Sequence, residues 1–368
     1  MHIVIITSSA KALFNLRKEL VESWIKANHK VTAIGDLPEE IFKDRCNQNG
    51  FDYKSVTLQR NGLNPLIDYR TLQELTALLK ELKPDRVFCT FAKAITYGAW
   101  AAKRAGITHV YSLMSGLGSI YRSDSIKAKL IRVLMDILYK NAFRCSKKVI
   151  FQNRDDQTLF VNKRLVNENK TVIVNGSGVD IDRFEASSFP MKSTFLFVGR
   201  LLKEKGIREY IAAANCIKEK YPDSVFWAVG DIDTNPSSLQ ESEVKKYQEE
   251  GLIEFEGFQD DVRSFIRKCD FFVLPSYHEG TPRCVLEAMS MGRPIITTDA
   301  PGCRETVIDG VNGFLVPVGD VNVLADKMAF LLENESKAHE MGLESRRIAE
   351  NKYDVRKVNR DYFSIMEL

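Results

Sequence analysis

Short apolar runs alternate with longer amphipathic stretches along almost the whole chain. Helical spacing of apolar residues predicts helices such as 11–27 and 94–105. In the first half, the predicted strands lie at 2–7, 30–34, 86–90, 108–112 and 147–152, with weaker candidates at 53–57 and 171–174. This alternation predicts βαβ units and parallel sheets that are covered by helices on both faces.

Glycine and polar residues interrupt this rhythm from Asn175 to Phe184 and on to Pro190, which predicts a linker between two domains. The alternation then restarts, with strands expected at 194–198, 224–229, 252–256, 270–274, 294–297 and 313–316. We therefore expect an α/β protein of two Rossmann-like parallel-sheet domains that face a central cleft. They would comprise residues 1–188 and 189–352, and a C-terminal helix in 353–368 would pack back on the first domain.

Composition narrows the class of protein. With 44% apolar and 27% charged residues and a net charge of +3, the chain is typical of a globular protein and carries no overall signature of nucleic-acid binding. Seven scattered cysteines without a CxxC pair predict reduced thiols of a cytosolic protein. The apolar run 2–7 is too short for a signal peptide, and no apolar stretch reaches the roughly 18 residues of a membrane span. We expect a cytoplasmic protein.

The segment 271–297 is the most informative for chemistry. A buried strand, Phe271–Leu274, runs into a loop, and a helix is expected to begin near Thr281–Pro282, with the threonine as its cap and the proline at the first helical position. A helix start at this edge of a sheet is suited to phosphate, because free N–H groups and the positive end of the helix dipole point outward. Glu279 precedes this start and Glu287 lies within the helix. Alone, the two glutamates could also merely cap and solvate the helix.

A second element follows the strand 194–198, where Gly199-Arg200 and Lys205-Gly206 place two cations in one short loop. Arginine can hold phosphate oxygens in a bidentate fork, and lysine acts as a point charge. A diphosphate leaving group needs such countercharge as its bond breaks. A solvated basic loop is the alternative interpretation.

Together these elements resemble the retaining glycosyltransferases of family 4, which have the GT-B fold. The resemblance covers essentially the whole chain and is strongest from Phe195 to Pro317. It is carried by Gly199-Arg200 with Lys205-Gly206, Gly257-Phe-Gln-Asp-Asp-Val262, Glu279-Gly-Thr-Pro-Arg-Cys-Val-Leu-Glu287 and Gly313-Phe-Leu-Val-Pro317. A lone Glu-x7-Glu is weak, whereas the set in this order is specific.

The resemblance implies a UDP-sugar as co-substrate, no other cofactor and no metal. Arg200 and Lys205 would bind its diphosphate, Glu279 the sugar near the reacting carbon, and Glu287 the ribose hydroxyls. The implied catalytic residues are Glu279, Arg200 and Lys205, and the implied donor-binding residues are Gly199, Gly257, Phe258, Gly280, Thr281, Pro282 and Glu287.

On the acceptor side, the resemblance implies roles for Ser8, Ser9, Lys93, Gly116, Gly118 and Tyr121. Many family members carry a histidine just after the fourth strand. This chain has Ala92-Lys93 there, and Lys93 could provide a polar contact instead. His109, which we expect inside an apolar strand, is interpreted as structural.

Within the family, Gly116-Leu-Gly-Ser-Ile-Tyr121 and Leu274-Pro-Ser-Tyr-His-Glu-Gly280 are similar to bacterial N-acetylgalactosaminyltransferases that act on undecaprenyl-diphosphate-linked diacetylbacillosamine. This similarity implies a lipid-linked acceptor. The basic segment 122–148 fits that implication, because Ile126, Leu130, Val133 and Ile137 form one helical stripe among cations that could dock on an anionic leaflet. A core-facing helix with a solvated basic face is equally compatible with the pattern.

The sequence therefore predicts a hexosyltransferase that moves a sugar, such as GalNAc or GlcNAc, from a UDP-sugar to an undecaprenyl-diphosphate-linked saccharide. We expect it at the inner face of the plasma membrane, in the assembly of surface polysaccharide or glycoprotein glycan. The alternatives are a sugar-nucleotide 2-epimerase, for which an added cluster of acid/base residues is missing, and a non-catalytic nucleotide-sugar-binding subunit. A nicotinamide-dependent enzyme is disfavoured, because neither half opens with GxGxxG after its first strand.

Overall fold

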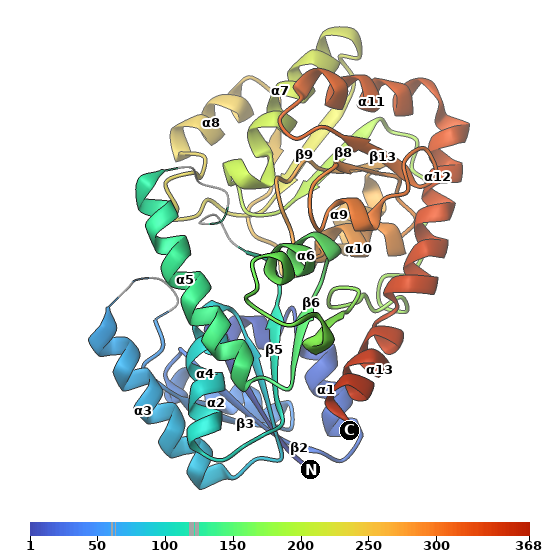
Figure 1. Ribbon diagram of the computed structural model, residues 1–368. Coiled ribbons are helices and arrows are strands. Elements are labelled where there is room, and N and C mark those ends of the chain that lie inside the picture. The colour runs from blue at the N-terminus through green and yellow to red at the C-terminus, as the bar shows by residue number, and fades with distance from the viewer. Residues whose placement is uncertain (60–61, 63, 118–120, 122–124) are drawn as a thin grey trace. The chain divides into compact units, whose positions relative to one another are not determined.

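The structure, a computed structural model, describes residues 1–59, 62, 64–117, 121 and 125–368. It divides into two compact units (Figure 1). The first contains Met1–Ser177 together with Val358–Leu368, and the second contains Gly178–Lys357.

The first unit is built on a parallel sheet of seven strands in the order β3-β2-β1-β4-β5-β6-β7. The strands are β1 (His2–Thr7), β2 (Lys30–Gly35), β3 (Asp52–Ser55), β4 (Arg86–Thr90), β5 (Val110–Met114), β6 (Lys148–Phe151) and β7 (Thr171–Ile173). Ile3 and Ile5 enter one hydrophobic core and Val4 and Ile6 the other, because successive side chains of a strand point to opposite faces. Burial on both faces explains why β1 is a continuous apolar run.

Helices cover both faces of this sheet (Figure 1). α1, α2 and α13 contribute to the core on one face, and α3, α4, α5 and α6 to the core on the other. Their bounds are α1 (Lys18–Lys26), α2 (Glu39–Gln48), α3 (Pro65–Leu82), α4 (Ala92–Arg104), α5 (Ile126–Cys145), α6 (Arg154–Asn162) and α13 (Val355–Met366), with short 3₁₀ turns η1 (Ala10–Leu13) and η3 (Glu168–Lys170).

The helix predicted at 11–27 is two separate elements. The backbone N–H groups of Leu16 and Arg17 both donate to the carbonyl of Ala12, so the chain turns after η1 and α1 begins at Lys18. Leu13 and Leu20 enter the same core across this break. The apolar spacing therefore continues where the helix does not, which is why the pattern predicted one helix.

The second unit contains a parallel sheet of six strands in the order β10-β9-β8-β11-β12-β13. The strands are β8 (Thr194–Val198), β9 (Val225–Val229), β10 (Glu254–Phe255), β11 (Phe271–Leu274), β12 (Ile295–Thr298) and β13 (Gly313–Val316). The helical elements are η4 (Lys203–Lys205), α7 (Ile207–Lys220), α8 (Glu241–Glu249), α9 (Arg263–Lys268), α10 (Arg283–Ser290), η5 (Arg304–Thr306), α11 (Val321–Glu333), α12 (Glu335–Ile348) and the π-helix η6 (Ala349–Tyr353).

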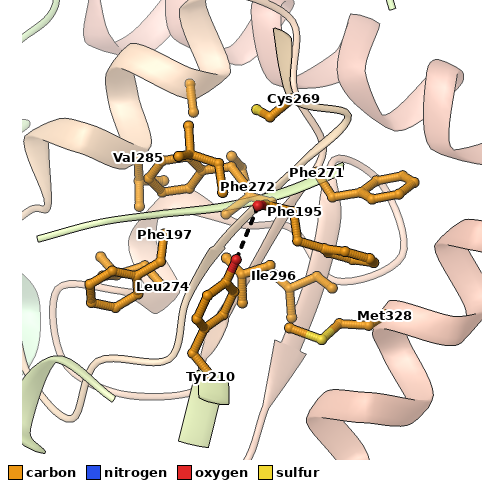
Figure 2. Packing of buried hydrophobic residues seen from close by; sticks show 14 of the residues in the cluster. Phe195, Phe197, Tyr210, Cys269, Phe271, Phe272, Leu274, Val285, Ile296 and Met328 are labelled. Atoms are coloured by element: carbon orange, nitrogen blue, oxygen red, sulfur yellow. Dashed lines mark hydrogen bonds between the residues drawn. The ribbon is translucent and has the colours of Figure 1, made fainter. Parts of the chain in front are cut away.

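Aromatic residues fill the core of the second unit around β8 and β11 (Figure 2). The rings of Phe195 and Phe226 stack with centroids 4.9 Å apart, and Phe195 also contacts Phe271. Tyr210 of α7 is buried among them and donates its hydroxyl hydrogen bond to the carbonyl of Phe195 at 3.0 Å. This bond satisfies the phenol where burial would otherwise be costly.

The domain boundaries differ from those predicted. The first unit ends at Ser177 rather than at 188, because Val179 and Phe184 of the predicted linker are buried in the core of the second unit. The returning segment begins at Val358 rather than at 353, because Tyr353 also belongs to that second core. Val358, Tyr362 and Met366 of α13 are buried in the first unit.

Candidate active site

The carboxyl edge of the second sheet brings two loops together. β8 pairs with β9 on one side and with β11 on the other, so the chain order reverses at β8. The loops that follow β8 and β11 therefore leave the same edge side by side. Such a switch point is where open α/β sheets bind ligands.

Lys205 and Glu279 meet at this switch point. Lys205 Nζ lies 2.5 Å from Glu279 Oε1, and the side chains are 24% and 13% exposed. Ser276 donates a further hydrogen bond to Glu279 Oε1 at 2.9 Å. The same Ser276 and the backbone of Tyr277 hold the carbonyl of Glu204 at 3.0 Å, which ties the two loops together. Two of the three predicted catalytic residues thus form one partly buried ion pair.

Glycines permit the close approach of these loops. Gly206 has a φ of +76°, and a Cβ there would lie 2.1 Å from the carbonyl oxygen of Pro275. Gly302 has a φ of +79°, and its Cβ would lie 2.1 Å from the carbonyl oxygen of Glu279. Both positions combine a left-handed backbone with a backbone contact that excludes any side chain.

Helix α10 begins one residue later than predicted. Pro282 is its N-cap rather than its first helical residue, because its ψ of 111° is extended, and its carbonyl accepts from Val285 at 3.1 Å. Within the helix, Arg283 Nε lies 3.1 Å from Glu287 Oε1, and both side chains are nearly buried. Gly280 and Thr281 lie in the turn ahead of Pro282, so Thr281 is not the helix cap that the sequence predicted. Arg283 is an additional charged residue of this helix start, and its i,i+4 spacing from Glu287 signals the pair in the sequence.

Arg200 has a different partner. Its Nη1 lies 2.7 Å from Asp233 Oδ2, on the segment that follows β9, and the arginine side chain is 51% exposed. Gly199 donates to the carbonyl of Val229 at 2.9 Å, which holds the start of this loop against β9. The structure therefore pairs Lys205 with Glu279 and directs Arg200 toward Asp233, a residue that the sequence analysis did not identify.

The predicted nucleobase segment follows β10. Gly257 accepts a hydrogen bond from Gly230 at 2.8 Å, and Phe258 N donates to Asp231 Oδ1 at 2.9 Å. The Phe258 side chain is 64% exposed. An exposed ring beside a strand end suits stacking on a flat ligand, and the nucleobase contact stays a prediction.

The thiols near the ion pair are poor nucleophiles. Burial raises the pKa of Cys303 to about 12 and also raises the pKa of Cys284. Because the thiolate is the reactive form, neither cysteine is expected to attack a sugar.

The first unit repeats the switch-point arrangement. β1 lies between β2 and β4, so Ser8 and Ser9 after β1 leave the same edge as Lys93 after β4. Lys93 Nζ lies 2.6 Å from Asp68 Oδ1, and Tyr97 donates to Asp68 Oδ2 at 2.9 Å. Asp68, 9% exposed, is a partner that the sequence analysis missed.

Backbone strain marks this edge. Phe91, between β4 and α4, has a φ of 71° and a ψ of 153°, a region that only glycine normally adopts. Such a conformation costs on the order of 1–3 kcal/mol and tends to occur at functional sites. Phe91 directly precedes Ala92-Lys93, where many family members carry a histidine.

Of the other acceptor-side predictions, Gly116 and Tyr121 follow β5 in the chain. Gly116 has a φ of +121°, and Gly118 lies outside the described residues. Tyr121 donates to Asp136 of α5 at 2.5 Å, and its ring lies 5.8 Å from that of Phe160. These contacts anchor Tyr121 on α5 and α6.

His109 precedes β5 and is not inside it. Its side chain is one-third exposed, and its Nε2 lies 3.7 Å from a carboxylate oxygen of Glu367. The strand starts at Val110, two residues later than predicted, and Val110 is the first residue of its buried run.

Two properties concern the described residues as a whole. They contain no group of three or more His, Cys, Asp and Glu side chains that could hold a metal ion. Among their helices, none has the length and apolar character needed to span a membrane. Independence from metal stays a prediction.

Two models of known glycosyltransferase families match this chain. Residues 17–176 match the model described as a glycosyl transferase 4-like domain, and residues 192–334 match that of the glycosyl transferases group 1. The chain belongs to the GT-B glycosyltransferases. The predicted family and the predicted two-sheet fold are thereby confirmed.

Curated relatives of this glycosyltransferase include two enzymes named for lipid-linked acceptors. The N,N'-diacetylbacillosaminyl-diphospho-undecaprenol alpha-1,3-N-acetylgalactosaminyltransferase of Campylobacter jejuni is 28% identical, over 91% of this chain and 90% of its own length. The UDP-Gal:alpha-D-GlcNAc-diphosphoundecaprenol alpha-1,3-galactosyltransferase of Escherichia coli is 29% identical, over 72% and 70%.

Solved structures share the fold of this glycosyltransferase. HepE of Anabaena, crystallised with UDP, matches with a TM-score of 0.79 at 20% identity, over the whole of both chains. Sucrose-phosphate synthase of Thermosynechococcus elongatus matches with a TM-score of 0.84 at 16% identity, over 100% of this chain and 98% of its own.

The contact between Gly206 and Pro275 yields a prediction about how the site is held. Gly206→Ala should lower the free energy of unfolding, measured by urea denaturation, by about 1–3 kcal/mol more than Gly251→Ala, because the new methyl group is forced into a backbone carbonyl. Gly251 is the matched control. Its φ of +63° is also left-handed, but a Cβ there meets nothing within 4 Å. Equal losses for the two variants would contradict the packing argument.

Proposed function

We propose that this glycosyltransferase moves an N-acetylhexosamine, such as GalNAc or GlcNAc, from a UDP-sugar to an undecaprenyl-diphosphate-linked saccharide. The Lys205–Glu279 pair at the switch point, next to the start of α10, carries the proposal for the donor site. The names of the Campylobacter and Escherichia relatives support a lipid-diphosphate acceptor.

The proposed reaction keeps the configuration of the reacting carbon and needs no metal. The bond between the anomeric carbon and the UDP oxygen breaks, and the acceptor oxygen bonds to the same face of that carbon. The acceptor proton goes to the departing diphosphate. Arg200 and Lys205 would offset the charge that grows on the diphosphate.

The ion pair also favours a particular role for Glu279. Its Oε1 accepts from both Lys205 and Ser276, so the carboxylate is held in place and partly neutralised. A carboxylate held in this way suits a contact to the donor sugar better than a covalent attack on it. This supports same-face attack within an ion-pair-like state rather than a protein nucleophile.

Glu287 tests the donor site through binding alone. Glu287→Gln keeps the size of the side chain but removes the charge proposed to accept from the ribose hydroxyls. Because hydrogen bonds to charged groups contribute about 1.5–3 kcal/mol, UDP should bind about 10- to 100-fold more weakly by calorimetry. Glu241→Gln at the exposed start of α8 is the control. Unchanged UDP affinity in Glu287→Gln would count against the ribose role.

The two cations after β8 test the reaction itself. Replacing Arg200 and Lys205 together by alanine should lower the rate of sugar transfer by at least about 10³-fold, because the countercharge to the leaving group is lost. Lys203→Ala, an exposed cation in the same loop, should be close to wild type. Thermal unfolding of each variant separates lost chemistry from lost folding. Near-normal transfer by a folded double variant would exclude the diphosphate role.

We further propose that α5 attaches the first unit to an anionic membrane. Ile126, Leu130, Val133 and Ile137, here called the apolar stripe, are 79%, 69%, 60% and 54% exposed. The buried side of α5 is formed instead by Ala128, Tyr139, Ala142 and Phe143. The alternative that the stripe faces the core is therefore wrong. Figure 1 shows α5 as a long outer helix of its unit.

The charged residues and the apolar stripe of α5 would both favour binding to an anionic membrane. Exposed Lys127 and Lys129 flank the stripe. Each aliphatic side chain that leaves water contributes roughly 1.5–3 kcal/mol when fully buried, and each cation near an anionic surface adds about 1 kcal/mol. A helix of this composition is suited to lie in the interface of the inner leaflet, where a lipid-linked acceptor would also reside.

The stripe can be tested by vesicle flotation. Replacing Leu130, Val133 and Ile137 together by serine should reduce binding to phosphatidylcholine vesicles containing phosphatidylglycerol by at least about 10-fold, since more than one buried aliphatic contact is lost. Reversing the charge of Lys127 and Lys129 should weaken binding in a salt-dependent way. Leu343→Ser, 59% exposed on α12, is the control. Unaltered flotation of the stripe variant would show that α5 is not the attachment surface.

A further inference from the structure

The two ends of α5 lie at opposite edges of the first sheet. α5 follows β5 and precedes β6, and these strands are parallel neighbours. The helix must therefore run from the carboxyl edge back to the amino edge. Its 20 residues cover about 30 Å at 1.5 Å per residue. Ile126 starts near the edge that carries Ser8 and Lys93, and Arg144 lies at the far edge.

A cavity of about 550 Å³ opens at this far end of α5. Its apolar lining comes from Phe143, Val161, Leu165 and Val166, and its polar lining from Lys140, Arg144, Arg164, Lys170, Asn167 and Glu168. Four cations thus face one carboxylate around an apolar floor. We call this hollow the basic cavity.

The four cations of the basic cavity differ in the contacts that their side chains make. Lys170 Nζ donates to the carbonyls of Phe143, Arg144 and Ser146, so it caps the C-terminus of α5. Arg144 reaches the side chain of Asn141 at 3.4 Å. Within the described part of the chain, neither Lys140 nor Arg164 makes a side-chain hydrogen bond or ion pair. Both are exposed, so their charge is available to a ligand.

Arg164 is held in an unfavourable backbone conformation. It ends the turn after α6 with a φ of +55°, and its N–H donates to the carbonyl of Val161 at 2.8 Å. The left-handed region is costly for any residue with a Cβ and favours glycine. The side chain at this position therefore adds a cation to the basic cavity at the expense of local backbone stability.

The apolar stripe continues into the basic cavity. Ile126, Leu130, Val133 and Ile137 are followed by Lys140 and Arg144 at alternating spacings of four and three residues. Residues at these spacings share one helix face. The face of α5 that is apolar near the carboxyl edge thus becomes cationic at the rim of the cavity.

We propose that the basic cavity binds the phosphate group of an anionic membrane phospholipid. This inference rests on the proposed attachment of α5 to the membrane and adds a second contact. Lys140, Arg144 and Arg164 would bind the phosphate, and the floor around Phe143 would cover the adjoining glycerol and first methylenes. The acceptor's own diphosphate is not the proposed occupant, because the saccharide attached to it would react at the carboxyl edge, near the other end of α5. Two contacts along one helix would fix how the first unit lies on the bilayer.

The test replaces cations without disturbing the fold. Arg164→Gly relieves the left-handed strain, so the variant should unfold at the same temperature as the wild type or higher. Arg164→Gly combined with Lys140→Ser should bind vesicles of phosphatidylcholine with phosphatidylglycerol about 10-fold more weakly. Binding of UDP should not change. The control pair, Lys103→Ser with Arg104→Ser, removes the same charge from the exposed end of α4.

Three results would overturn the proposal. The first is an equal loss of vesicle binding in the control pair, which would indicate general electrostatics. The second is unchanged vesicle binding by the Arg164 and Lys140 variant while the stripe variant no longer binds vesicles. This result would support attachment by α5 but contradict a phosphate site in the basic cavity. The third is that inorganic phosphate or glycerol phosphate alone binds the wild type as tightly as the vesicles do. Retained vesicle binding by the stripe variant would instead refute the attachment of α5 itself.

Discussion

The candidate active site depends on the backbone contact between the loop after β8 and the loop after β11. Lys205 and Glu279 are 74 residues apart in the chain, and they meet because Gly206 lets its loop pack directly on the carbonyl of Pro275. Gly302 likewise lets its segment pack directly on the carbonyl of Glu279. The sheet order makes β8 and β11 neighbours, and the glycines allow the backbones of the two loops to come into contact.

The ion pair formed in this way contributes more to positioning than to stability. Partly buried pairs gain Coulomb energy but lose hydration, and removing one partner is costly because the other charge stays behind. Both side chains nevertheless keep some exposure, so a ligand can reach them. The Arg283–Glu287 pair in α10 is also a partly buried ion pair whose side chains keep some exposure. Each acidic group that the sequence motif assigns to the donor has a cation of the protein beside it.

The sequence predicted the strands well because most of them are buried on both faces, and their apolar runs therefore stand out. It predicted the loops that bear Lys205 and Glu279, since glycine and proline mark them. It could not predict Asp68 beside Lys93 or Asp233 beside Arg200, because no local pattern records which distant carboxylate a cation will meet. The boundary at Ser177 was missed for a related reason. Val179 and Phe184 lie in a polar, glycine-rich stretch, and only their burial assigns them to the second unit.

The spacing of the apolar stripe of α5 does not by itself determine whether the stripe faces the core or the solvent. Its spacing fits a core-facing helix as well as a membrane-facing one, and only the burial of Ala128, Tyr139 and Ala142 on the opposite side separates the two. Large aliphatic side chains are then left in water while small and aromatic ones pack inside. Exposed apolar surface of this kind is retained where a partner covers it. Because the stripe begins near the edge with Lys93 and ends at the basic cavity, the surface that would meet the bilayer spans the unit from its reacting edge to its far edge. Membrane contact and access to a lipid-linked acceptor would then be set by the same helix.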